Sequence, residues 1–158
     1  MATGAVAGLV GITPGAGFVT PAAGMAIGAI TGLLCYFSVQ LKVSLRFDDS
    51  LDTFAVHGVG GTIGAILTGV FASAELISSH PAGQVLAENG RFALIGGQFQ
   101  AVLVAYGLAA LGTLLIAAVL RGLGMPFRVP EEAENLGVDV REHGEEAYAE
   151  RIGSPQFH

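Results

Sequence analysis

Residues Asp48 to Ala72 read DDSLDTFAVHGVGGTIGAILTGVFA, and this stretch places an ionisable side chain, His57, inside a segment apolar enough to cross a bilayer. At helical spacings of three or four residues, the stretch predicts one face that carries an imidazole among small residues. The members of that face are Phe54, His57, Gly61, Gly64 and Thr68. Such a face suits close helix packing or the wall of a pathway, because ionisable residues within a membrane tend to line pathways.

The composition of the whole chain indicates a membrane protein. Of its 158 residues, 52% are apolar and 13% are charged, and the mean hydropathy is +0.64. A soluble domain carries about 25% charged residues. The chain has 24 glycines and no tryptophan, which favours transmembrane helices that pack through close backbone approach. The net charge of −6 comes mostly from acidic residues after Arg121, and it argues against nucleic acid as a partner.

Uncharged apolar runs divide the chain into a transmembrane region, residues 1–120, and an aqueous tail, residues 121–158. The runs predict full spans at about 21–41, 53–72 and 92–120, with a partial helix at 1–12. Twelve residues cover only about 18 Å, whereas the hydrocarbon core is about 30 Å thick. The first run is either an interfacial or re-entrant stub or the end of a helix that starts further upstream, and we prefer the second interpretation.

Turn and cap signals separate these runs. In TPGAGFVTP, residues 13–21, Thr20 is placed as an N-cap and Pro21 as the first helical residue. Either Asp49 or Asp52 can cap the span that carries His57. Residues 73–91 are polar and are expected to form a loop. In the span at 21–41, glycines at every fourth position predict a smooth face for a neighbouring helix.

Basic residues near the span ends predict the orientation in the membrane. Lys42, Arg46, Arg121 and Arg128 fall on one side, and Arg91 falls on the other. Because positive residues accumulate in cytoplasmic segments, the first side is expected to be cytoplasmic. The chain is then a multi-pass protein of the cell membrane with its C-terminus in the cytoplasm and the turn at 13–21 facing outward.

The chemistry available to His57 is limited. In an apolar span the imidazole is expected to be neutral, because desolvation disfavours the charged form. A neutral ring has one donor and one acceptor, so it can hydrogen-bond a small uncharged solute or pass on a proton. No His, Cys or carboxylate lies three or four residues after His57, so neither a metal nor a cofactor is expected. No hydrolase or nucleotide-binding motif is present in the sequence, which argues against an enzyme.

Three motifs resemble the family of ammonium transporters, methylammonium permeases and Rhesus proteins. The first is D-x-F-x-V-H-G-V-G-G followed by G-A-I-L-T-G-V-F-A, within Asp48 to Ala72. The second is GITPGAGFVTP, Gly11 to Pro21. The third is RVPEEAENLGVDVREHGEEAY, Arg128 to Tyr148. The resemblance covers essentially the whole chain and implies an all-α channel fold of about eleven helices, of which this chain corresponds to the C-terminal third.

The resemblance also implies roles for individual residues. His57 would be the second of two histidines that line a narrow hydrophobic pore, and Thr13 would lie near an outer recruitment site for ammonium. Phe54, Gly61 and Gly64 would pack the pore helix. The family further implies ammonium or ammonia as substrate with methylammonium as an analogue, a homotrimer in membrane lipid, and a tail that binds PII signal proteins. The tail residues concerned would be Arg128, Glu131, Gly137, Asp139, His143, Gly144 and Tyr148.

Two other functions remain open from the sequence. The chain could be a truncated, non-conducting membrane protein that acts only through helix packing or through binding of a PII protein by its tail. An intramembrane enzyme would need a second catalytic group near His57, and the sequence offers none at helical spacing.

Overall fold

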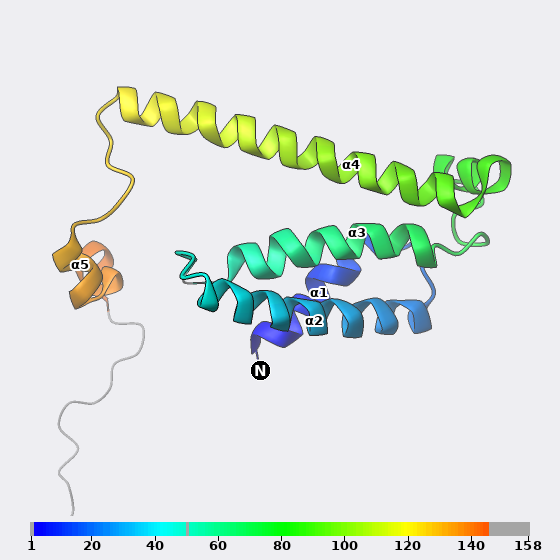
Figure 1. The fold of residues 1–158 in the computed structure, drawn as a ribbon, viewed down its shortest axis with the longest axis horizontal. Helices are drawn as coiled ribbons and strands as arrows, with labels where there is room; N and C mark the ends of the chain where they lie inside the picture. Colours follow the sequence, from blue (N-terminus) through cyan, green and yellow to red (C-terminus); the bar gives the residue numbers. More distant parts are fainter. Residues whose placement is uncertain (1, 50, 146–158) are drawn as a thin grey trace, which may run out of the picture. The chain divides into compact units, whose positions relative to one another are not determined.

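Three helices of the chain are long and apolar enough to cross a membrane. The structure is a computed structural model that describes residues 2–49 and 51–145. Within these residues the candidate spans are Pro21–Ser44, Phe54–Phe71 and Pro81–Gly122. The regular elements of the described residues are all helical: α1 (Ala2–Ile12), η1 (Thr13–Gly15), α2 (Pro21–Ser44), η2 (Phe54–Val59), α3 (Gly60–Phe71), α4 (Pro81–Gly122), α5 (Glu131–Leu136) and η3 (Asp139–His143). The predicted all-α membrane fold, with three spans and a short first helix, is confirmed (Figure 1).

The chain divides into two compact units, residues 1–108 and 109–158. In the first unit, α2 and α3 run antiparallel and α1 packs against both of them (Figure 1). Few side chains are buried between these helices, and most of them are small; they include Ala7, Ile27, Thr31, Cys35 and Val56. A core of this kind brings the helix backbones close together.

Glycines create the contact between α1 and α2, as the four-residue spacing predicts. Gly28 lies against the backbone of Gly8: a Cβ atom built at Gly8 would stand 3.4 Å from the Gly28 carbonyl oxygen. One turn further on, a Cβ at Gly32 would lie 3.8 Å from the Gly4 carbonyl oxygen. The smooth face predicted for α2 is therefore confirmed as the surface that receives α1.

The turn between α1 and α2 is stabilised by a helix cap at the start of α2 and by backbone contacts with the end of α3. The Thr20 side chain accepts a hydrogen bond from the Ala23 amide at 3.4 Å, and Pro21 is the first residue of α2, so the predicted cap is confirmed. The Ser73 amide donates to the Phe18 carbonyl oxygen at 2.8 Å, and Val19 forms an antiparallel bridge with Ala72. The turn at residues 13–20 is therefore fastened to the end of α3.

The structure differs from the expected loop at residues 73–91, because α4 already begins at Pro81. The helix is interrupted at Gly90, whose φ of 80° and ψ of 177° are outside the helical region. Ala82 and Leu86 precede this break and pack on a cluster formed by Ala72, Ile77 and Leu94. Gln84, Glu88 and Asn89 of this segment are exposed, so polarity alone predicts a loop.

Gly64 of α3 lies directly against the backbone of α1, and we predict that it cannot be replaced by a larger residue. A Cβ at Gly64 would lie 2.2 Å from the Gly11 carbonyl oxygen. We expect Gly64→Ala to lower the free energy of unfolding by about 2 kcal/mol or more, because α1 and α3 must move apart. Thermal unfolding in detergent micelles would measure this loss.

Gly61→Ala is the matched control, because no atom lies within 4 Å of a Cβ at Gly61. Alanine also has the higher helix propensity, so this variant should unfold at or slightly above the wild-type temperature. Equal destabilisation by the two substitutions would contradict the glycine contact.

Candidate functional site

His57 lies in a π-helical turn, Phe54–Val59, at the start of the span that α3 completes. A π-helical turn inserts an extra residue into the helix, and such turns are frequent at functional sites. Ala55 and Val56 are buried, whereas His57 is exposed. The Val56 carbonyl oxygen accepts a hydrogen bond from the Cys35 Sγ of α2 at 3.9 Å. The turn is therefore fixed on its inner side and presents the imidazole on its outer side.

The face expected from regular spacing divides into two in the structure. Gly64 and Thr68 are buried, and Gly64 lies against α1. Phe54 is 53% exposed, and its ring packs on Gly58 and lies 6.0 Å from the ring of Phe47. Gly61 is half-buried and has open space where a Cβ would stand. His57 therefore shares the accessible side of the helix with Phe54, and Gly64 belongs to the packed side.

An ion pair and a cap anchor the beginning of the His57 turn. The two carboxylate oxygens of Asp49 accept hydrogen bonds from the amides of Thr53 and Phe54, each at 2.9 Å, which confirms Asp49 as a cap. Asp52 instead pairs with Lys42, whose Nζ also donates to the Asp49 carbonyl oxygen. The side chain of Lys42 is 11% exposed and that of Asp52 is 25% exposed, so this pair is largely shielded from water. It ties the end of α2 to the start of the His57 turn.

Arg91 fixes the opposite end of α3. Its guanidinium donates to the carbonyl oxygens of Gly69, Val70 and Ala72 at 3.1, 2.9 and 3.0 Å. These are carbonyls at the C-terminus of α3, where a helix leaves its acceptors without partners. Sequence reasoning used Arg91 only to predict orientation. Its partners are about twenty residues away, so no local spacing could identify them.

Thr13 is exposed, and its hydroxyl donates to the Leu9 carbonyl oxygen at 2.7 Å. A cavity of about 100 Å³ begins at the next residue, Pro14. Its polar lining comes from Thr68, His80 and Gln98. The His80 ring contacts the Phe18 ring edge-to-face, and its Nδ1 accepts from the Ala82 amide at 3.1 Å. The structure thus places Thr13 beside a small cavity without making it part of the lining.

The tail forms a small helical unit of its own. α5 spans Glu131–Leu136, and the π-helical turn η3 spans Asp139–His143. Ala133 is fully buried between them. The Arg128 guanidinium donates to both carboxylate oxygens of Glu134, at 2.9 and 3.3 Å, and Arg141 pairs with Glu132 at 3.7 Å. These charge pairs and the buried methyl group of Ala133 stabilise the unit.

Most of the tail residues singled out from the sequence occupy the ends of these elements. Glu131 begins α5, Gly137 ends it, Asp139 and His143 bound η3, and Gly144 follows. The φ angles of Gly137 and Gly144 are 102° and 68°, a region that favours glycine. His143 is exposed. Tyr148 lies outside the described residues.

No group of three His, Cys, Asp or Glu side chains that could hold a metal ion occurs among the described residues. The candidate site is instead one exposed imidazole on a candidate membrane span that is anchored at both ends. This arrangement can offer a hydrogen-bonding group to a small solute in an otherwise apolar surrounding. The fold and the site therefore define a helical membrane protein with a polar group on a span.

The sequence model of the Ammonium Transporter Family matches residues 1–148, and the chain belongs to this family. It is 43% identical over 151 residues to the ammonium transporter of Bacillus subtilis, a match that covers 95% of this chain and 36% of that protein. It is 36% identical to the ammonium transporter MEP2 of Saccharomyces cerevisiae, over 95% of this chain and 31% of that protein.

Solved structures agree with this assignment. The crystal structure of Saccharomyces cerevisiae Mep2 aligns with a TM-score of 0.64 at 34% identity, and it covers 80% of this chain and 29% of the Mep2 chain. Candida albicans Mep2 aligns with a TM-score of 0.53 at 30% identity. The chain spans about a third of the length of the relatives that it matches.

The Arg128–Glu134 pair predicts a pH dependence of the tail unit. The hydrogen bond from Arg128 holds the pKa of Glu134 below its ordinary value of 4.5. Because the folded pKa is lowered, the stabilisation is present above pH 4.5 and is lost as the pH falls through the folded pKa. We expect amide exchange in α5 to accelerate over that acidic range. A titration of the Glu134 carboxyl signal by NMR would follow the same proton.

Arg128→Gln is the control, since it removes the hydrogen-bonded charge and should return the pKa of Glu134 to its ordinary value. An unchanged titration of Glu134 in this variant would contradict the assigned cause.

Proposed function

We propose that the chain takes part in ammonium transport across the cell membrane and supplies His57 as a lining residue of an ammonia pathway. The observation that carries this proposal is the exposed imidazole in a π-helical turn of a membrane span, in a chain that belongs to the ammonium transporter family. Ammonia is small and uncharged. A neutral imidazole can donate one hydrogen bond to it and accept another, while apolar walls exclude hydrated cations.

The surroundings of His57 support this role. The inner side of its turn is fixed by buried Ala55 and Val56, and its start is fixed by Asp49 and by the Lys42–Asp52 pair. A turn held in this way moves little when a solute passes, which keeps the backbone that carries the imidazole in place. The outer side of the turn is open, and in our proposal further helices of the family fold close the pathway there.

The proposed assembly is a homotrimer in membrane lipid, with one pathway in each subunit. Large apolar side chains cover much of α2 and α4 at the surface of the chain, among them Met25, Phe37, Leu111 and Leu114. Such a surface requires lipid or other membrane helices as its partner. In this proposal Thr13 and the nearby cavity face outward, and the span ends near Lys42 and Arg121 face the cytoplasm, as the distribution of basic residues suggests.

His57→Ala in the complete transporter tests the pore assignment. Loss of the imidazole removes the only hydrogen-bonding side chain that we place in the pathway, so we expect at least a tenfold change in ammonium flux or a loss of discrimination between ammonium and methylammonium. Flux would be measured in proteoliposomes. The binding of a tail partner should not change and serves as the control. Wild-type rate and selectivity in this variant would refute the pore role.

We further propose that the tail is a regulatory element on the cytoplasmic side that binds a PII signal protein. The compact ion-paired unit formed by α5 and η3 supports this role, because a preformed surface loses less entropy on binding than an unstructured terminus. The alternative is a non-conducting protein that acts only through this tail. It would use the same binding surface of the tail but would not transport ammonium.

Deletion of residues 128–158 tests the tail. We expect it to abolish association with a PII protein in a pull-down from detergent, because α5 and η3 are both removed. His57→Ala should leave the association intact. Retained binding after the deletion would contradict the regulatory role, and binding together with an absence of flux in the full chain would favour the non-conducting alternative.

A further inference from the structure

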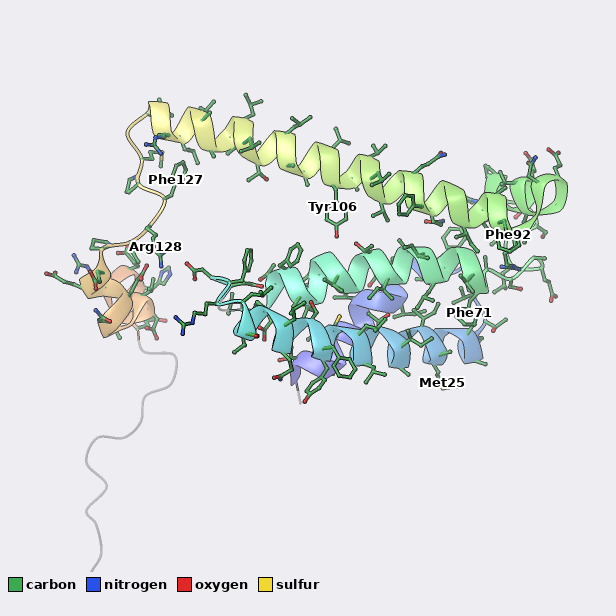
Figure 2. The ribbon with its side chains drawn as sticks, in the orientation of Figure 1. Met25, Phe71, Phe92, Tyr106, Phe127 and Arg128 are labelled. Carbon is green, nitrogen blue, oxygen red and sulfur yellow. The ribbon has the colours of Figure 1, made fainter. Side chains whose placement is uncertain are left out.

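The carbonyl oxygen of Gly58, the residue that follows His57, contacts two hydroxyl groups. The Thr62 hydroxyl lies 2.7 Å from it, and the Tyr106 hydroxyl lies 3.0 Å from it. The two hydroxyl oxygens are themselves 2.6 Å apart. Thr62 belongs to the same helical segment, whereas Tyr106 reaches across from α4, as Figure 2 shows. The three oxygens form a closed triangle on the turn that carries His57.

The number of protons limits how this triangle can be bonded. A carbonyl oxygen only accepts, and each hydroxyl donates one proton. Two protons cannot make three ordinary bonds, so three arrangements are available. In the first, both hydroxyls donate to the Gly58 carbonyl oxygen, which has two lone pairs. In the second, Tyr106 donates to Gly58 and Thr62 donates to Tyr106; in the third, Thr62 donates to Gly58 and Tyr106 donates to Thr62. Tyr106 donates in all three arrangements, so the turn is tied to α4 in each of them.

We propose that Tyr106 is a positioning residue that holds the His57 turn in its π-helical form. The proposal rests on the function proposed for His57. A π-helical turn is less favourable than an α-helical turn, and it persists where side chains stabilise it. A return to α-helical geometry would shift the segment before Gly60 by about one residue, and with it the direction of the imidazole by about 100°.

The position of Tyr106 along α4 suits this role. Arg91 fastens the start of the same helical stretch to the carbonyls at the C-terminus of α3. Near that end, a Cβ at Gly69 would lie 3.2 Å from Ile95 Cα, so the two backbones are close there. Tyr106 is fifteen residues beyond Arg91, or about 22 Å along a helix. It thus provides a second fastening at the end of the span that carries His57.

Tyr106→Phe in the complete transporter tests this inference, because it removes the hydroxyl and keeps the ring. Two readouts report on position: the NMR signals of the His57 ring, and amide exchange over residues 58–63. We expect the ring signals to shift. We also expect the rate of amide exchange to rise about threefold, the factor for loss of an average hydrogen bond between membrane helices, and by at most about twentyfold, the factor for the strongest such bonds. Ammonium flux, measured in the same preparation, should fall by a similar factor.

Two further variants separate positioning from general loosening of the fold. Thr62→Val keeps the Tyr106 hydroxyl within hydrogen-bond distance of the Gly58 carbonyl oxygen, so Tyr106 can donate to it directly and we expect a smaller change in both readouts than in Tyr106→Phe. Tyr36→Phe is the matched control, because Tyr36 is an exposed tyrosine of α2 whose ring contacts Phe37. This variant should match the wild type in ring signals, exchange and flux.

The outcomes distinguish this inference from the proposed function. Wild-type His57 signals and exchange in Tyr106→Phe, or equal changes in Tyr36→Phe, would overturn the positioning role. If Tyr106→Phe moves the His57 signals while His57→Ala leaves the flux unchanged, Tyr106 still positions the imidazole and the pore assignment fails. Shifted signals together with a reduced flux would support both.

Discussion

The packing of the first unit depends on the approach of two backbones without side chains between them. Gly64 of α3 lies against the carbonyl of Gly11 in α1, and Gly8 of the same helix lies against Gly28 of α2. Such approaches are favourable within a membrane because the two backbones make van der Waals contact and glycine has no side chain whose motion would be restricted. Packing has to supply this stability, since no hydrophobic effect drives helices together in lipid. Because Gly64 must face α1, the rotation of α3 about its axis is determined. The accessible position of His57 follows from that rotation and from the extra residue in the π-helical turn.

Much of this arrangement could be predicted from local sequence signals. The three spans follow from uncharged apolar runs, the start of α2 from Thr20 and Pro21, and the face that receives α1 from glycines at every fourth residue. Asp49 was one of two candidate caps, and the structure selects it because Asp52 is engaged by Lys42. Each of these signals acts over a few residues of chain. The residues that cause each of these features are therefore close in the sequence to the feature itself, and the feature can be predicted from them.

Other features could not be predicted because their causes are distant or weakly encoded. The π-helical turn has no residue signature, so regular spacing placed His57 and Gly64 on one face, whereas the structure separates them. Tyr106 reaches Gly58 across forty-eight positions of sequence. The helical start at Pro81 could not be predicted because the segment is mostly polar, and few of its residues, among them Ala82 and Leu86, pack on the apolar cluster at Ile77. In these places the tertiary contact determines the local structure.

Arg91 has an electrostatic consequence for the end of α3. The last carbonyls of a helix carry a partial negative charge of about half an elementary charge, and in an apolar surrounding this charge attracts monovalent cations. The Arg91 guanidinium occupies three of those carbonyls and places a full positive charge beside them. A guanidinium keeps its charge over the whole physiological pH range. The positive charge of Arg91 thus compensates the partial negative charge at the end of α3 at all physiological pH values, and its donors occupy carbonyls that would otherwise be available to a cation.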